Sequence, residues 1–498
     1  MKKILSYVML AAVTWIAAMP VYGAAPVSDA TQECLDCHAT FHPGIVADWR
    51  ASRHAQMTVQ EAIIVEDVAR KVSATDIPAP LLNVAVGCAE CHTLRNEKHA
   101  DAFEHNGADI HVVVSPDDCA TCHADERQQY SKNLMAHAHS NLVDNDLYRD
   151  LQRNISGPAE VKDGALVFGT PSTATQEDSC LYCHGTRLAV TGREIRDTDA
   201  GELAFPVISG WPNQGVGRVN LDGSLGSCSA CHTRHGFSIE VARKPHTCKE
   251  CHVGPDVPAV KVYEASKHGN IFSSLNQDWD FKTVPWVVGK HFTAPTCAAC
   301  HVSLLTNTDG LVVAQRTHQM TDRLADRLFG LVYAHPQPKS PETQIIRSPS
   351  GLSLPTDLDG TPASAFLIDT DEQGRRRDVI KGVCVSCHDR SWVRGHFERL
   401  DHVIGETNAT VKVATGIISK AWTDGIVSGP PQKKSPFDEA LERTWMDGWL
   451  FYANTVRFSA AMGGGGDYST FADGRYQLTR SLLQLHQGYQ QGMAAIKK

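Results

Sequence analysis

The chain has 498 residues, of which 42% are hydrophobic and 21% charged, and its formal net charge is −9. This length would ordinarily hold several domains with apolar cores. The negative charge argues against a nucleic-acid partner. It suits docking to a basic electron-carrier protein, and simple solubility explains it equally well.

Residues 1–24 have the pattern of a secretory signal peptide. Two lysines precede an apolar run from Ile4 to Ala18, and small residues surround Gly23. The run is short for a membrane helix, and no later stretch approaches 18 consecutive apolar residues. We therefore expect a mature protein that is soluble in the periplasm or an equivalent extracytoplasmic compartment.

Every one of the 16 cysteines belongs to a C-x-x-C-H motif, the attachment signature of haem c. Two thiols three residues apart can reach the two vinyl groups of one porphyrin, and the following histidine can ligate the iron. Zinc sites and thioredoxin-like pairs do not require that histidine. The sequence therefore predicts eight covalently bound haem c groups. The motifs are Cys34/Cys37/His38, Cys88/Cys91/His92, Cys119/Cys122/His123, Cys180/Cys183/His184, Cys228/Cys231/His232, Cys248/Cys251/His252, Cys297/Cys300/His301 and Cys384/Cys387/His388.

The haems change the expected fold, because the porphyrins themselves supply much of the buried apolar surface. We expect a mainly α multihaem cytochrome c with little regular sheet, a haem-packed core and long C-terminal helices. After the signal peptide, residues 25–155 form an N-terminal trihaem region and residues 156–398 a pentahaem region. Turn-forming residues between 145 and 175 indicate a connection there. The motifs that begin at Cys228 and Cys248 are close in sequence and predict two closely packed haems.

Residues 399–498 contain no cysteine and have helical periodicity. We expect one helix that includes 400–422, a second that starts at Ser435 and Pro436, and a third from about 473 to 494. Gly463 to Gly466 separate the last two. They are not a phosphate loop, because no Gly-Lys-Ser/Thr follows them.

Of the 24 histidines, 16 lie outside the motifs and can supply second axial ligands. A haem that only passes electrons usually has such a ligand, whereas a catalytic haem keeps one position open. We expect His42, His99, His402 and His486 to be ordinary structural or surface residues. The candidates are His54, His105, His111, His137, His139, His235, His246, His268 and His291, and the favoured ones are His54, His139, His235 and His268.

The order and spacing of the motifs, followed by a haem-free helical end, resemble the octahaem hydroxylamine oxidoreductase (HAO) family. The last five haem sites also resemble pentahaem nitrite reductases, but those typically have lysine where this chain has His184. The resemblance covers nearly the whole mature chain. Local matches are residues 217–224, Thr233-Arg234-His235, Gly254-Pro255-Asp256 and the segment from Tyr263 to Gly269.

The resemblance implies that the haem of Cys180, Cys183 and His184 is catalytic. It also implies that Tyr468 is bonded to the catalytic haem of a neighbouring subunit in a homotrimer. Asp256 would accept protons, with His268 and Tyr263 as further candidates.

Val257 departs from the family, which has histidine at this position. The departure leaves the direction of the reaction open.

Three functions follow. The first is oxidation of hydroxylamine or hydrazine, with seven bis-histidine haems that pass electrons to a partner such as a small cytochrome c. The second is reduction of nitrite or hydroxylamine, toward nitric oxide or ammonium, at the same haem. The third is a non-catalytic electron conduit in which every iron is six-coordinate.

Overall fold

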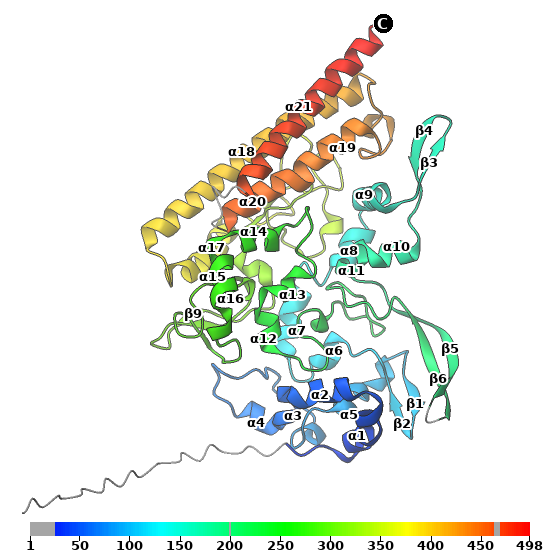
Figure 1. The fold of residues 1–498 in the computed structure, drawn as a ribbon, viewed down its shortest axis with the longest axis vertical. Coiled ribbons are helices and arrows are strands. Elements are labelled where there is room, and N and C mark those ends of the chain that lie inside the picture. The colour runs from blue at the N-terminus through cyan, green and yellow to red at the C-terminus, as the bar shows by residue number, and fades with distance from the viewer. Residues whose placement is uncertain (1–24, 199–200, 463–468) are drawn as a thin grey trace, which may run out of the picture.

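The computed structural model describes residues 25–198, 201–462 and 469–498 (Figure 1). The expected signal peptide and Tyr468 lie outside this part of the chain. Among the described residues, no helix combines the length and the apolar character needed to cross a membrane. The architecture confirms the expected class, a mainly helical protein with small sheets and long C-terminal helices.

The N-terminal part consists of short helices joined by irregular segments. Ser28 caps the first helix by accepting a hydrogen bond from the Thr31 amide at 3.1 Å. The Glu90 carboxylate accepts hydrogen bonds from the hydroxyls of Ser28 and Thr31 at 2.6 and 2.7 Å, which fixes the first motif against the second. The elements are α1 (Asp29–Phe41), α2 (Pro43–Ala51), α3 (Arg53–Gln56), α4 (Val59–Ile63), α5 (Cys88–His92), β1 (Phe103–His105), β2 (Ala108–Ile110), α6 (Pro116–Cys119), α7 (Ala124–Ser131) and α8 (Ala138–Val143).

The segment expected to be a connection is largely ordered. Asn145 caps helix α9 (Asp146–Ser156) by accepting a hydrogen bond from the Leu147 amide at 3.0 Å. The antiparallel strands β3 (Ala159–Lys162) and β4 (Ala165–Phe168) follow as an exposed hairpin. The turn residues thus flank these elements and do not replace them.

The central part carries five motifs on short helices and loops. Its strands form only two- and three-stranded sheets, of which β5 and β6 make the longest hairpin. The elements are α10 (Thr173–Asp178), α11 (Cys180–His184), β5 (Ala189–Thr198), β6 (Gly201–Ser209), α12 (Ile239–Arg243), α13 (Pro245–Lys249), α14 (Ala259–Ala265), α15 (Lys267–Leu275), β7 (Trp286–Val287), α16 (Cys297–His301), β8 (Leu305–Thr306), β9 (Val312–Ala314), β10 (Asp326–Arg327), β11 (His335–Pro336) and α17 (Thr370–Val385).

The C-terminal helices pack side by side in a bundle that extends away from the motifs (Figure 1). They are α18 (Arg390–Thr423), α19 (Ala440–Asp447), α20 (Ala453–Ala461) and α21 (Phe471–Ile496), with a π-helical turn at Gly448–Tyr452 between α19 and α20. Trp422, Trp445 and Trp449 are almost fully buried in its core. The Trp422 indole donates a hydrogen bond to the buried Glu442 carboxylate at 2.7 Å.

The second C-terminal helix begins later than Ser435. It starts at Ala440, where Glu439 and Glu442 form a capping box. The Ser435 hydroxyl accepts a hydrogen bond from the Asn154 side chain of α9 at 3.1 Å. This contact holds the segment against α9, so the serine does not cap a helix.

We predict that Leu485→Ala lowers the free energy of unfolding by about 2–5 kcal/mol, because Leu485 is 1% exposed in the bundle core. The matched control is Leu483→Ala on the same helix, whose side chain is 65% exposed, with an expected change within about 0.5 kcal/mol. Urea unfolding of the haem-loaded protein, followed by far-UV circular dichroism, measures both values. Equal losses in the two variants would contradict this packing.

Candidate functional site

All eight motifs line one continuous cavity of about 3630 Å³. In the helical motifs, such as α5, α11 and α16, the two cysteines are three residues apart and the histidine follows at the next position. Helical spacing therefore places the thiols and the imidazole on one face, toward the cavity. The cavity and its donor set fit covalently attached haem c groups.

Three of the motif imidazoles are held by backbone carbonyls. Nδ1 of His92, His123 and His184 lies 2.8, 3.1 and 3.0 Å from a carbonyl oxygen. Such a contact fixes the ring and leaves Nε2 for the metal. Burial lowers the pKa of His232 to about 3, which favours the neutral imidazole that binds iron.

Five motif histidines face a second imidazole at the distance that a shared iron requires. Two iron–nitrogen bonds of about 2.0 Å, plus the offset from each nitrogen to its ring centre, separate the centres by about 6.3 Å. The observed separations are between 6.1 and 6.4 Å. The pairs are His38–His105, His123–His54, His92–His235, His232–His318 and His388–His268.

His92 has two imidazole neighbours, and only one lies on the iron-binding side. The His111 ring is 6.1 Å away, but the carbonyl of His111 lies 2.8 Å from Nδ1 of His92. His235, whose ring centre is 6.4 Å away, is therefore the partner consistent with binding through Nε2. His111 lies in a separate cluster.

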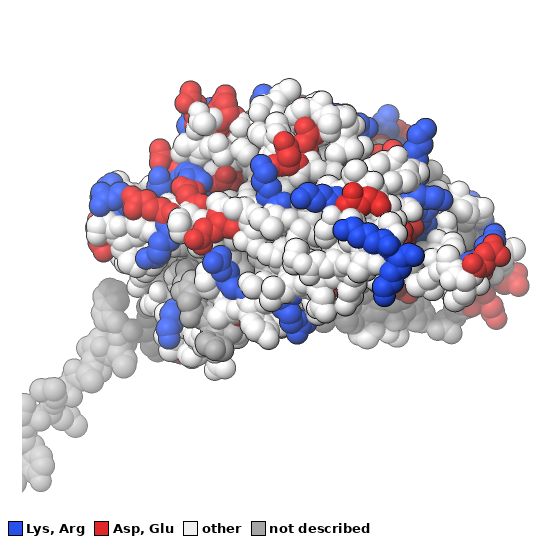
Figure 2. Space-filling view, turned by 90° about the horizontal axis from the view of Figure 1, so that it is seen from above, with Lys and Arg blue, Asp and Glu red and all other residues white. Residues whose placement is uncertain are grey.

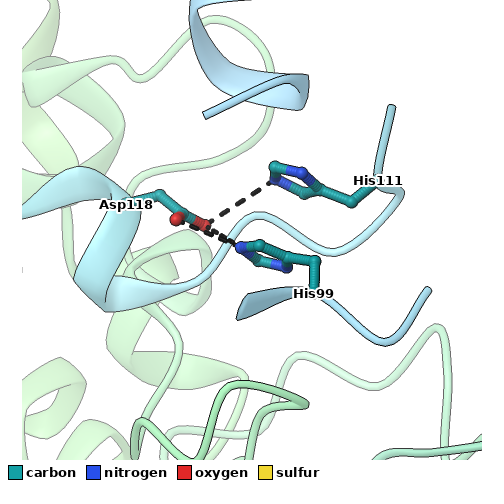
Figure 3. Close-up of side chains that lie close together, drawn as sticks. All are labelled: His99, His111 and Asp118. Carbon is teal, nitrogen blue, oxygen red and sulfur yellow. Dashed lines mark hydrogen bonds and ion pairs between the residues drawn. The ribbon is translucent and has the colours of Figure 1, made fainter. Parts of the chain in front are cut away.

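That cluster contains His99, His111 and Asp118, all buried (Figure 3). Their potential ligand atoms lie within 4.8 Å of one another, but the two rings are stacked in parallel with centres 3.6 Å apart. Arg95 already donates to Asp118 at 3.0 Å. Burial opposes the charged form of His99, and hydrogen bonds with Asp101 and Asp118 outweigh it and raise the pKa to about 9. The geometry suits a buried ion-pair cluster and not a cation site.

His318 is the facing residue that the sequence analysis did not single out. It lies in a loop after β9, with no motif beside it. Its backbone is held by α7 and the residues that follow, since its amide donates to the Gln129 side chain at 2.9 Å and its carbonyl accepts from Asn133 at 3.0 Å. These two amides are distant in sequence, so no local signal identifies the position.

Among the described residues, His184, His252 and His301 have no second imidazole within the 6.4 Å that marks the other pairs. His139 is close to His184, and its Nδ1 lies 2.7 Å from the Gly185 carbonyl oxygen. His246 lies beside Phe272. Nδ1 of His291 accepts a hydrogen bond from the Val287 amide at 3.1 Å. Nε2 of His137 lies 2.8 Å from the Ser131 carbonyl oxygen.

The motif of Cys180, Cys183 and His184 is distinguished by the charged groups around it. The Asp256 carboxylate acts electrostatically on both thiols and on the imidazole. Arg327 also acts electrostatically on His184, and it lies near the Tyr148 side chain.

These charged and polar groups reach the cavity from separate segments. Tyr148 comes from α9, Arg327 from β10, and Asp256 from the loop after the sixth motif. A single site with both charges and a phenol can bind a small polar molecule and handle protons.

The two further proton-handling candidates lie elsewhere. The Tyr263 hydroxyl donates to the Pro295 carbonyl at 3.2 Å within an apolar cluster. His268 faces His388 with ring centres 6.2 Å apart. Val257 lines the cavity beside Asp256 and offers no titratable group.

The thiols indicate the order in which the motifs adjoin. Side-chain contacts join Cys34 to Cys88, Cys119 to Cys228, Cys183 to Cys251 and Cys248 to Cys297. Three further pairs of thiols lie near enough to interact electrostatically. They are Cys91 and Cys122, Cys231 and Cys248, and Cys300 and Cys384. The sites therefore adjoin in the order one, two, three, five, six, seven and eight, and the fourth adjoins the sixth.

The chain is similar to known multihaem proteins. Residues 221–326 match the family model described as seven times multi-haem cytochrome CxxCH. A solved structure titled hypothetical multiheme protein is 39% identical, with a TM-score of 0.89, and the match covers 95% of this chain and 98% of that one. This chain therefore belongs to the multihaem c-type cytochromes.

Two more distant matches come from Kuenenia stuttgartiensis. A probable nitrite reductase-hydroxylamine oxidoreductase fusion protein is 22% identical over 423 residues, which are 81% of this chain and 39% of the fusion protein's length. A reducing HAO-like protein complex is 16% identical with a TM-score of 0.62, over 94% of this chain and 86% of that one. The second match shows a shared fold.

We predict that His318→Ala opens one further iron to carbon monoxide, because it removes the imidazole that faces His232. The control is His111→Ala, which removes a fully buried imidazole that lies behind Nδ1 of His92. Carbon monoxide titration of the reduced protein, normalised to haem content, measures the change. An unchanged count in the His318 variant would contradict the pairing, as would a gain in the His111 variant.

Proposed function

We propose that this protein is an HAO-like oxidoreductase of small nitrogen compounds, with its reaction centre at Cys180, Cys183 and His184. One observation carries the proposal. His184, like His252 and His301, faces no second imidazole at the distance of the five pairs, and of these three motifs only that of His184 has Asp256 acting on both thiols as well as on the imidazole. The haem held there would bind the substrate nitrogen and exchange electrons with it. Seven further haems would carry electrons to or from an external partner.

Oxidation of hydroxylamine or hydrazine is the function that the family resemblance supports. Hydroxylamine gives nitric oxide, three protons and three electrons, so a base near the site accelerates the reaction. Asp256 is placed to take these protons. A bond between Tyr468 and the haem of a neighbouring subunit, in a homotrimer, belongs to this proposal.

Reduction of nitrite is the second candidate, and two residues favour it. Val257 leaves Asp256 without the histidine expected beside it, and Arg327 adds a cation to the site. Nitrite, two protons and one electron give nitric oxide and water. This direction requires electrons from a reduced carrier such as a small cytochrome c.

The charge pattern of one face bears on how such a carrier would dock there. On the face shown in Figure 2, basic and acidic side chains are interspersed. Short-range fit then contributes more to docking than long-range steering, which needs extended fields of one sign.

We predict that Asp256→Asn lowers turnover of hydroxylamine or nitrite by about 100-fold or more, because the site loses its proton-transferring carboxylate. Steady-state kinetics with haem content as a check measure the effect. The control is Asp278→Asn, an exposed carboxylate on another segment, with unchanged turnover. Full activity without the Asp256 carboxylate would rule out this reaction centre.

Mass spectrometry of the haem peptide that contains Cys180 and Cys183 separates the two directions. For oxidation we expect this peptide to be bonded through its haem to the peptide that contains Tyr468, and Tyr468→Phe should abolish the bond. A haem peptide free of that bond in the unaltered protein would leave reduction as the supported direction. Failure of the reduced protein to bind any carbon monoxide would instead indicate a pure electron conduit.

A further inference from the structure

We infer that the outer edge of strand β3 is a docking surface for a second copy of this chain. Two copies of β3 pair antiparallel about a two-fold axis at Val161 and join two hairpins into one four-stranded sheet. The contact is independent of the proposed reaction centre, because residues 159–168 do not line the cavity of the motifs.

The hairpin of β3 and β4 projects beyond α9, and nearly all of its residues are exposed (Figure 1). Asp163 and Gly164 close it, and their φ angles of 53° and 82° fit a type I′ turn. Among the described residues, β4 is the only strand that pairs with β3. A hairpin of two strands without cover is marginally stable in water, whereas a sheet of more strands is more stable.

The backbone of β3 presents free hydrogen-bonding groups at its outer edge. At the open end of the hairpin, the Gly169 amide donates to the Pro158 carbonyl at 2.8 Å. Backbone groups alternate between the two sides of a strand, so the even-numbered residues of β3 bond to β4. The amide and carbonyl groups of Ala159 and Val161 therefore point outward. An edge of this kind is a template for another strand.

The charges of β3 match a copy of the same strand. Antiparallel pairing centred on Val161 places Glu160 of each copy opposite Lys162 of the other. These positions form pairs without backbone hydrogen bonds, in which opposed side chains lie closest, so two ion pairs can form. Both side chains are exposed, and among the described residues neither has an ion-pair partner in its own chain.

The other face of the hairpin is apolar. Ala159, Val161, Leu166 and Phe168 share this face, because opposed residues of antiparallel strands point to the same side. The Val161 side chain is 74% exposed and that of Leu166 55%. Pairing brings the two Val161 side chains together and extends the apolar face across both copies. A contiguous exposed apolar surface is typical of an interaction site.

The outer edge of β4 matches a second copy less well. Strand β4 has no charged side chain, so no ion pair would fix its register. Phe168 at its end already contacts Arg443, whose guanidinium lies 5.0 Å from the ring centre. A two-fold contact through β3 closes at two chains, and its combination with the proposed homotrimer gives six.

Charge reversal at β3 tests the contact. Glu160→Lys and Lys162→Glu each place like charges opposite each other, so each should weaken association about 10- to 100-fold. The double variant restores opposite charges and should associate like the unaltered protein, as should an equal mixture of the two single variants. Sedimentation velocity of the haem-loaded proteins at low ionic strength measures the number of chains. The control is Glu202→Lys on the exposed hairpin of β5 and β6, with no expected change.

Val161→Pro is a second test, because it removes an amide that points outward and leaves the bonds between β3 and β4 in place. It should halve the number of chains in the assembly. A single chain or a trimer as the largest species of the unaltered protein would overturn the inference. Association that survives in either single charge variant, or that is lost in the double variant at full haem content, would overturn it as well.

Discussion

The facing imidazole pairs are the constraint on which the rest of the fold depends. Each pair brings together segments that are distant in sequence, such as α3 with the third motif or the loop of His318 with the fifth. A shared iron would fix these segments more strictly than apolar packing can, because ligand bonds have defined lengths and directions. The short helices and loops around the motifs can therefore be irregular without being loose. Extended apolar packing is needed mainly in the C-terminal bundle, where the largest hydrophobic cluster lies.

Sequence patterns predict what depends on neighbours along the chain. The motifs, the mainly helical class and the long C-terminal helices follow from fixed spacing and from helical periodicity. The start of α19 could not be predicted, because Ser435 is engaged by Asn154 of a distant helix. The same reason applies to His318, whose position depends on Gln129 and Asn133 and not on any nearby motif.

The candidate reaction centre likewise combines residues that the sequence identifies with residues that it does not. Cys180, Cys183 and His184 form a local motif, and resemblance to a family adds Asp256. Tyr148 and Arg327 have no local signature, since a tyrosine or an arginine at one position is compatible with many environments. Their connection with the reaction centre becomes visible only in the structure, where α9 and β10 bring them near the same motif. Chemistry that depends on convergence of distant segments is therefore the part that sequence reasoning misses.

The position of the fourth motif is suited to a reaction that exchanges several electrons. Its Cys183 thiol contacts Cys251 of the sixth motif, which adjoins both the fifth and the seventh. Electrons exchanged at the fourth site could therefore divide between two directions, one toward the N-terminal motifs and one toward the eighth. A site within a linear series would also carry electrons that pass between its neighbours. A site that branches from the series is free of that role, so an open iron position there does not interrupt transfer between the others.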